Sequence, residues 1–234
     1  MTLKAAVVTF PGSNCDQDMH RAVQLMQWDL VKLWHGNALE EPVDLILIPG
    51  GFSYGDYLRC GALARFSPAM ASVHEHARQG GGILGVCNGF QILCEAGLLP
   101  GALTRNAGLK FRCIWTHLRV EENSAPLAAG LQQGATIRIP IAHGEGNYQC
   151  HAEDLVRLRE KGQIVFRYAT PEGKVNEASN PNGSMDNIAG ITDEAGRILG
   201  MMPHPERAME DILGGTEGRR VFESIEMALA RAGA

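Results

Sequence analysis

The chain has 234 residues, with 21 basic and 26 acidic side chains and a formal net charge of −5. This length suits one substantial α/β domain, so we expect residues 1–234 to form a single domain. A mildly acidic chain without runs of like charge disfavours nucleic acid or an anionic membrane as the main partner. No stretch reaches the length of a membrane span, and residues 1–10 lack a signal-peptide pattern. We expect a soluble, cytoplasmic protein.

The first part of the chain alternates between strands and helices. Apolar runs predict strands at residues 3–10, 30–34, 45–48 and 82–86, and helices are expected at about 16–27, 68–78 and 90–96. Because most of these strands are apolar on both faces, they predict a parallel sheet with helices on both sides.

After Gly97 the pattern changes. Strands are predicted at 113–120, 136–141 and 164–170 with little helix between them, which indicates an antiparallel extension of the sheet. Residues 188–191 and 198–202 predict a late hairpin, and 219–231 an amphipathic helix. The expected fold class is therefore α/β, with a mostly parallel sheet.

The six cysteines are scattered and include no C-x-x-C pair: Cys15, Cys60, Cys87, Cys94, Cys113 and Cys150. A chain of this size and apolar content does not need disulfides. The nearest approach to a zinc-ligand spacing is His74-x-His76, without a second pair downstream. We therefore expect no metal site, and we assign chemistry to one thiol only.

That thiol is Cys87, in the segment Gly85-Val86-Cys87-Asn88-Gly89 between a predicted strand and a predicted helix. Small residues two positions either side of a nucleophile, at a strand-to-helix turn, are typical of a nucleophile elbow. Glycine removes β-carbons that would clash in so tight a turn. Without this context a buried structural cysteine would be the simpler interpretation.

A candidate base follows a late strand, in Met202-Pro203-His204-Pro205-Glu206. The prolines stiffen the segment, so His204 and Glu206 can point the same way. A carboxylate on one imidazole nitrogen fixes the tautomer and favours the imidazolium, which stabilises a thiolate.

The strand at 45–48 runs into the turn Pro49-Gly50-Gly51. Ligands bind at the carboxyl ends of parallel strands in α/β sheets. The backbone N–H groups of Gly51 and Asn88 are candidates for an oxyanion hole. Alone, this turn is weak evidence for a site.

Together, Pro49-Gly50-Gly51, Gly85-x-Cys87-x-Gly89-x-Gln91 and His204-Pro205-Glu206 resemble the class I (triad) glutamine amidotransferases. Four further segments resemble one branch of that family, the glutaminase subunits of phosphoribosylformylglycinamidine synthases of de novo purine synthesis. These segments are residues 7–16, 51–62, 140–146 and 180–184.

The resemblance implies a flavodoxin-like fold and a catalytic triad of Cys87, His204 and Glu206. Cys87 would attack glutamine and form a γ-glutamyl thioester, releasing ammonia. The resemblance also implies a set of substrate-binding residues: Gly50, Gly51, Asn88, Gln91, Asn106, Phe111 and His143.

The implied partners are a large synthetase subunit and a small auxiliary subunit. The large subunit would use ATP and magnesium to convert formylglycinamide ribonucleotide (FGAR) to the amidine (FGAM). No cofactor is expected on this chain itself.

One position departs from the family. Gly108 stands in Asn106-Ala107-Gly108-Leu109-Lys110-Phe111 where relatives tend to have serine. A side-chain contact from position 108 to glutamine is therefore lost, which bears on glutamine affinity.

Two alternative functions are left open by the residues alone. One is a cysteine hydrolase of the DJ-1/PfpI type, a group that commonly places its histidine directly after the nucleophile, where this chain has Asn88. The other is a non-catalytic, flavodoxin-like binding module, for which Cys87, His204 and Glu206 would be coincidental.

Overall fold

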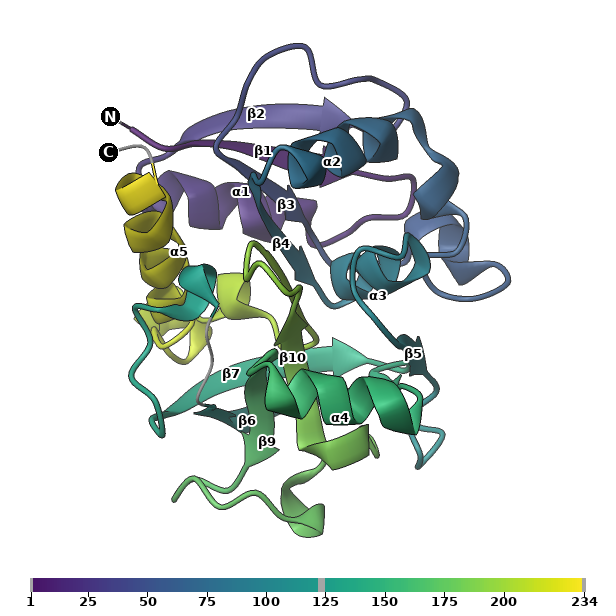
Figure 1. Cartoon of the computed structure of the whole chain (residues 1–234), viewed down its shortest axis with the longest axis vertical. Coiled ribbons are helices and arrows are strands. Elements are labelled where there is room, and N and C mark those ends of the chain that lie inside the picture. The colour runs from purple at the N-terminus through teal and green to yellow at the C-terminus, as the bar shows by residue number, and fades with distance from the viewer. Residues whose placement is uncertain (1, 122–124, 233–234) are drawn as a thin grey trace.

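A computed structural model describes residues 2–121 and 125–232 of the chain. Its main feature is a nine-stranded sheet with the order β2-β1-β3-β4-β11-β10-β9-β6-β7. Figure 1 shows how this sheet runs through the molecule, with the first strands at one end and β6, β7 and β9 at the other. The expected α/β class, with its mostly parallel half and antiparallel extension, is confirmed.

The parallel half consists of five strands, whose side chains are largely buried except on the edge strand β2. It is formed by β1 (Lys4–Thr9), β2 (Asp29–Trp34), β3 (Leu45–Ile48), β4 (Gly82–Val86) and, from far along the chain, β11 (Ile198–Met201). Each of these strands pairs in parallel with its neighbours within this group.

Helices cover both faces of these strands. The helices of this half are α1 (Asp16–Leu25), α2 (Pro68–Arg78), α3 (Asn88–Glu95) and α5 (Arg219–Ala232). A β-carbon on Gly82 of β4 would approach Leu229 of α5, whereas one on Gly85 would meet Leu93 of α3. Since residues three apart on a strand face opposite sides, α5 and α3 cover opposite faces.

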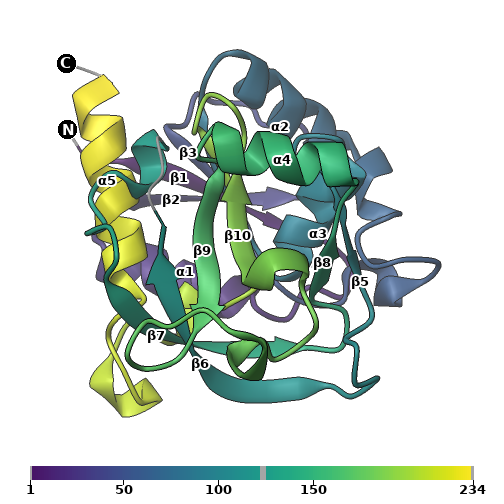
Figure 2. The same ribbon diagram turned by 60° about the horizontal axis from the view of Figure 1, so that its bottom comes forward.

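The antiparallel half contains β6 (Arg112–Val120), β7 (Thr136–His143), β9 (Ile164–Ala169) and β10 (Ile188–Thr192). Strands β10 and β11 form the predicted hairpin, which joins the two halves of the sheet. Figure 2 shows β9 and β10 running side by side, with α4 lying across one end of them.

Three elements were not predicted: β5 (Ala102–Thr104), β8 (Asn147–Gln149) and α4 (Ala152–Glu160). The expectation of little helix in this region is therefore wrong at α4. Only Leu158 of this helix is buried, so its apolar periodicity is weak. Acidic residues in its first turn and basic ones in its last turn were the available signal. No helix of the described ranges is long and apolar enough to cross a membrane.

Candidate active site

The site lies where β3, β4 and β11 end. Ile48 of β3 pairs with Gly85 of β4, and Met201 of β11 pairs with Val86. Because these three parallel strands are adjacent and end at the same edge, the segments that follow them meet there. Gly50 and Gly51 follow β3, Cys87 follows β4, and His204 follows β11. The sheet order thus brings together residues that are distant in the sequence: Gly50 and His204 are 154 positions apart.

Cys87 forms a sharp turn between β4 and α3. Its φ of 52° and ψ of −106° place a non-glycine residue in a strained conformation. Its N–H donates to the carbonyl of Met201 at 2.8 Å, which anchors the turn to the neighbouring strand. The side chain is 5 % exposed and lines a cavity. This is the geometry of a nucleophile elbow.

Two glycines make the elbow possible, as predicted. A β-carbon on Gly85 would lie 2.8 Å from the backbone of Gly89. One on Gly89 would collide with the carbonyl of Ile48 on β3. Helix α3 therefore packs against the sheet at a distance that only glycine permits at these two positions.

His204 and Glu206 lie directly behind the thiol. The N–H of His204 donates to the carbonyl of Pro140 on β7 at 2.8 Å, and Glu206 follows in a short 3₁₀ turn, η6 (Pro205–Arg207). The His204 Nδ1–H donates to Glu206 Oε1 at 2.6 Å. The two side chains are 1 % and 0 % exposed. Their hydrogen bond leaves Nε2 as the imidazole atom available to the thiol.

The charges at this pair depend on its neighbours. Burial alone would lower the pKa of His204, but the neighbouring Glu206 and Cys87 side chains, with the hydrogen bond to Glu206, raise it to about 10. The site therefore favours a protonated imidazole beside the Glu206 carboxylate. An imidazolium beside a cysteine is the arrangement that activates a thiol as a nucleophile.

The turn after β3 approaches the triad closely. A β-carbon on Gly50 would lie 2.8 Å from His204 Cε1 and 3.3 Å from Cys87 Cβ. Gly51 has a φ of 137° and forms a β-bridge with Ser13. Asn88 is the first residue of α3, so its N–H has no acceptor within the helix. Gly51 and Asn88 thus lie on the two turns that flank Cys87, and the oxyanion hole stays a prediction.

A cavity of about 210 Å³ opens beside Cys87. Its volume lies below the ~300–1,000 Å³ of sites for drug-sized ligands, which suits a small metabolite. Of the residues assigned from the sequence, five line it: Gly51, Cys87, Gln91, Phe111 and His143. The sequence analysis did not assign six other lining residues, although most lie in the motifs it singled out: Phe52, Asp56, Cys60, Ala142, Gly144 and Glu145.

Side-chain amides brace the cavity wall. The Asn88 Nδ2–H donates to Gln91 Oε1 at 2.9 Å, and Gln91 Nε2–H donates to the carbonyl of Glu145 at 2.6 Å. Asn88 Oδ1 accepts from the N–H of Ser53 at 3.2 Å. The elbow helix is thereby tied to both loops that flank the cavity.

Asn106 and His143 form a second buried unit. Asn106 Nδ2–H donates to the carbonyls of Lys110 and His143, and Asn106 Oδ1 accepts from the N–H of Gly146. The same Oδ1 lies 3.1 Å from His143 Nδ1, which must therefore be the protonated nitrogen. Burial and the neighbouring His204 lower the pKa of His143 to about 3. His143 is neutral, with Nε2 as an acceptor.

The remaining predicted positions lie at the rim. Phe111 is 55 % exposed at the mouth of the cavity. Gly108 is exposed, and the nearest atom to a β-carbon there is 3.7 Å away on Arg112. A serine would therefore fit at position 108 without collision.

One group in the described part of the chain has the donor set of a metal site: Cys15, His204 and Glu206, with ligand atoms within 4.8 Å of one another. The His204–Glu206 hydrogen bond and an Arg207 guanidinium 3.0 Å from the Cys15 sulfur already engage these atoms. A cation would have to displace both, so this set is poorly suited to a metal.

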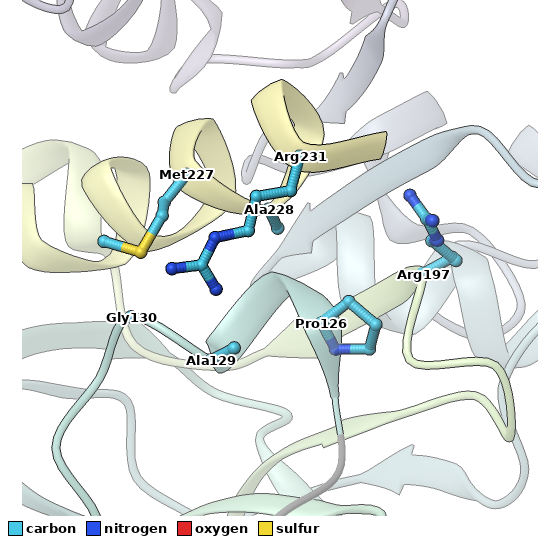
Figure 3. Close-up of a pocket in the computed structure, with 7 residues that line it drawn as sticks. All are labelled: Pro126, Ala129, Gly130, Arg197, Met227, Ala228 and Arg231. Atoms are coloured by element: carbon cyan, nitrogen blue, oxygen red, sulfur yellow. The ribbon is translucent and has the colours of Figure 1, made fainter. Parts of the chain in front are cut away.

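A second cavity of similar volume lies between α5 and the turn η3 (Pro126–Ala128). Figure 3 shows Arg231 reaching into it from α5, with Arg197 on the opposite side. No nucleophile or base is present among its lining residues: Pro126, Ala129, Gly130, Arg197, Met227, Ala228 and Arg231.

Residues 2–219 match the model of the CobB/CobQ-like glutamine amidotransferase domain. The chain belongs to this family. That membership rules out the DJ-1/PfpI-type alternative.

Curated relatives cover nearly the whole chain. It is 55 % identical over 224 residues to phosphoribosylformylglycinamidine synthase subunit PurQ of Moorella thermoacetica, covering 95 % of each chain. It is 52 % identical to the subunit of the same name from Koribacter versatilis, over 98 % of this chain and 100 % of that one.

Among solved structures, a chain of PurLQS from Thermotoga maritima superposes with a TM-score of 0.85 at 42 % identity. The match covers 97 % of this chain and 98 % of the other. The amidotransferase site described above therefore lies in a fold shared with that chain over almost its full length.

Proposed function

We propose that this chain is the glutaminase subunit of a phosphoribosylformylglycinamidine synthase. It hydrolyses glutamine to glutamate and ammonia, and it passes the ammonia to an ATP-dependent synthetase subunit that converts FGAR to FGAM. The full-length similarity to two PurQ subunits supports the pathway. The observation that carries the chemistry is the buried Cys87–His204–Glu206 array beside a small cavity.

In the proposed first step, the Cys87 thiolate attacks the side-chain amide carbon of glutamine and a C–S bond forms. The N–H groups of Gly51 and Asn88 stabilise the negative oxygen. His204 then gives its proton to the leaving nitrogen as the C–N bond breaks, so ammonia departs and a γ-glutamyl thioester remains. Glu206 holds His204 in the required orientation.

In the second step, His204 takes a proton from water, which attacks the thioester carbon. The C–S bond breaks, and the sulfur leaves as a thiolate while glutamate is released. Thiol, imidazole and carboxylate suffice for both steps. We therefore propose that the chain uses no metal or cofactor of its own, and that ATP and magnesium serve the synthetase.

The remaining predicted residues bind glutamine in this proposal. Gln91, Phe111 and His143 line the cavity, and Asn106 fixes the tautomer of His143. The wall also carries the carboxylates of Asp56 and Glu145, which suit the α-ammonium group of an amino acid.

We propose that the complex contains a large synthetase subunit and a small auxiliary subunit, and that docking raises glutaminase activity. The loop that follows Gly51 supports this idea. Tyr54, Asp56 and Leu58 all have positive φ values, and the Leu58 side chain is 88 % exposed. Strained backbone of this kind persists at sites that rearrange, so contact with a partner can reshape the cavity.

We also propose a cytoplasmic location. All six cysteines are free, which is the usual state of thiols in a reducing compartment. This location suits an enzyme that depends on one unpaired thiol.

One assay with two nitrogen sources tests the function. In the assembled complex, Cys87→Ala should abolish amidine formation from glutamine and leave formation from an ammonium salt intact. Cys94→Ala, which removes another buried thiol two turns along α3, serves as the control. Equal loss with both nitrogen sources would show that Cys87 serves the synthetase reaction or the assembly, and the ammonia-donor function would fall.

A further inference from the structure

Behind the triad, the first helix meets the turn that carries Glu206. Glu206 Oε1 accepts from His204, but Oε2 is buried with no hydrogen-bond partner in the part of the chain that the structure describes. A buried carboxylate with one unsatisfied oxygen is costly unless cations compensate its charge. His204 is one such cation. A second positive charge near Oε2 would lower this cost further.

Arg207 supplies it. Its Nε–H donates to Asp18 Oδ2 at 2.9 Å, and its Nη2–H donates to Cys15 Sγ at 3.0 Å. The Cys15 sulfur in turn lies within 4.8 Å of ligand atoms of both His204 and Glu206. The Cys15 sulfur thus lies between the guanidinium and the carboxylate, and none of the three residues lines the cavity.

Cys15 behaves as a neutral spacer in this arrangement. It is 3 % exposed, and burial raises the pKa of its thiol to about 12 although Arg207 opposes this. Its S–H donates to Asn14 Oδ1 at 3.3 Å, so the sulfur can accept from Arg207. A neutral thiol adds no negative charge beside Arg207, so its half-exposed partner Asp18 is the anion that pairs with the guanidinium, and part of the positive charge still acts on the triad.

We propose that Arg207 is a positioning residue of the triad: anchored on Asp18 of α1 and on Cys15 just before that helix, its guanidinium partly compensates the Glu206 carboxylate and holds it behind His204. The side chains then form a row of alternating charge, in the order Arg207, Glu206, His204 and Cys87. The inference rests on the proposed thiol chemistry, because it concerns the state in which Cys87 reacts.

Other charged groups on the elements around this turn make their own contacts. Strand β7 supplies His143, which is neutral. Gly218, the residue before helix α5, lies against Pro205 and is flanked by Glu217 and Arg219. Glu217 accepts from the Arg138 N–H, and Arg219 donates to the carbonyl of Leu25. Within the described residues, Arg207 is therefore the cation assigned to Glu206 on this side.

The test measures how fast iodoacetamide alkylates Cys87 as a function of pH, followed by the mass of the Cys87 peptide. Because the triad titrates as a coupled unit, removing a nearby positive charge raises the pH at which the unit loses its first proton. In Arg207→Met the acid limb of the rate should move upward by about one pH unit. In Arg207→Lys, which keeps the charge, it should stay within a few tenths of a unit.

Arg21→Met is the matched control. Arg21 also joins α1 to the segment after η6, through two hydrogen bonds to Glu210, and it lies away from Cys15. If Arg207 only tied these elements together, Arg21→Met would move the acid limb equally, and that result would overturn the proposal. If Arg207→Met does not fold, Arg207→Gln carries the test, because it keeps a donor but no charge.

The outcomes separate this inference from the proposed function. A wild-type Cys87 that stays inert while another thiol reacts would overturn both. If Cys87 reacts in the wild type, but the acid limb of its alkylation rate does not move in folded Arg207→Met or Arg207→Gln, the positioning role alone is overturned. In the Glu206→Gln background, Arg207→Met should move the limb no further, since the carboxylate it acts on is gone.

Discussion

His143 and His204 are neighbouring buried imidazoles that favour opposite charge states. Burial and His204 lower the pKa of His143 to about 3, whereas Glu206 and Cys87 overcome burial and raise the pKa of His204 to about 10. Each imidazole has its Nδ1–H bonded to an oxygen, on Asn106 and on Glu206 respectively. A carboxylate partner gives a cation, and an amide partner leaves a neutral acceptor.

His143→Asn should weaken glutamine binding. The asparagine amide can replace the Nδ1–H donor to Asn106 but removes the Nε2 acceptor. We expect the KM for glutamine to rise roughly tenfold with a smaller change in kcat, as for loss of one buried hydrogen bond. The pH profile should keep its shape, because His143 is neutral throughout the working range. A shifted profile with an unchanged KM would contradict this role.

Substitutions in the triad should differ in severity. Cys87→Ala removes the covalent route and should abolish glutaminase activity. His204→Ala removes acid–base catalysis, which is typically worth ~10²–10⁴-fold. Glu206→Gln keeps a side chain of the same size beside Nδ1 and should cost least. Steady-state rates with the synthetase present would measure this order, and a Glu206→Gln enzyme as inactive as Cys87→Ala would refute it.

Gly50→Ala should damage activity more than stability. The new methyl group would lie 2.8 Å from His204 Cε1 and 3.1 Å from the Cys15 sulfur, so it would displace the base. Overpacking of this kind costs ~1–3 kcal/mol of folding free energy, whereas a misplaced base costs orders of magnitude in kcat. Activity and urea unfolding should be measured together. Gly36→Ala, which meets only Trp34 at 3.4 Å, is the control; similar activities in the two variants would contradict the prediction.

The folded state should lose stability at low pH because the buried His20 resists protonation. This α1 residue is 6 % exposed, and neither ring nitrogen has a hydrogen-bond partner among residues 2–121 and 125–232. Burial, and to a lesser extent Lys32, lower its pKa below the ordinary histidine value of 6.5. The unfolded state therefore binds the proton more readily, so the free energy of unfolding decreases as pH falls below about 6.5.

His20→Leu should flatten that pH dependence, and the exposed His74→Leu should not. Urea unfolding at pH 7.5 and at pH 5.5 gives the comparison. If the free energy of unfolding falls by the same amount between these pH values in the wild type and in His20→Leu, groups other than His20 cause the loss.

The chain's local patterns were enough to predict the sharp turn at Cys87 and the pairing of His204 with Glu206. Glycine at 85 and 89 around a cysteine, between an apolar strand and a helix, predicts the elbow because few other sequences can make so tight a turn. His204 and Glu206 are two residues apart and stiffened by proline, so their pairing is also local. The parallel strands were equally readable, because continuous apolar runs leave little choice of structure.

The arrangement of these parts depended on the sheet order, which no local pattern contains. Only the adjacency of β3, β4 and β11 places Gly50, Cys87 and His204 at one edge. The sequence pattern assigns no chemistry to Cys15, yet this residue lies against the triad because α1 packs on η6. The sequence by itself thus determined the reactive groups, whose geometry is set within a few residues. The tertiary structure alone decided their charge states and supports, because burial and long-range contacts set the electrostatics of a site.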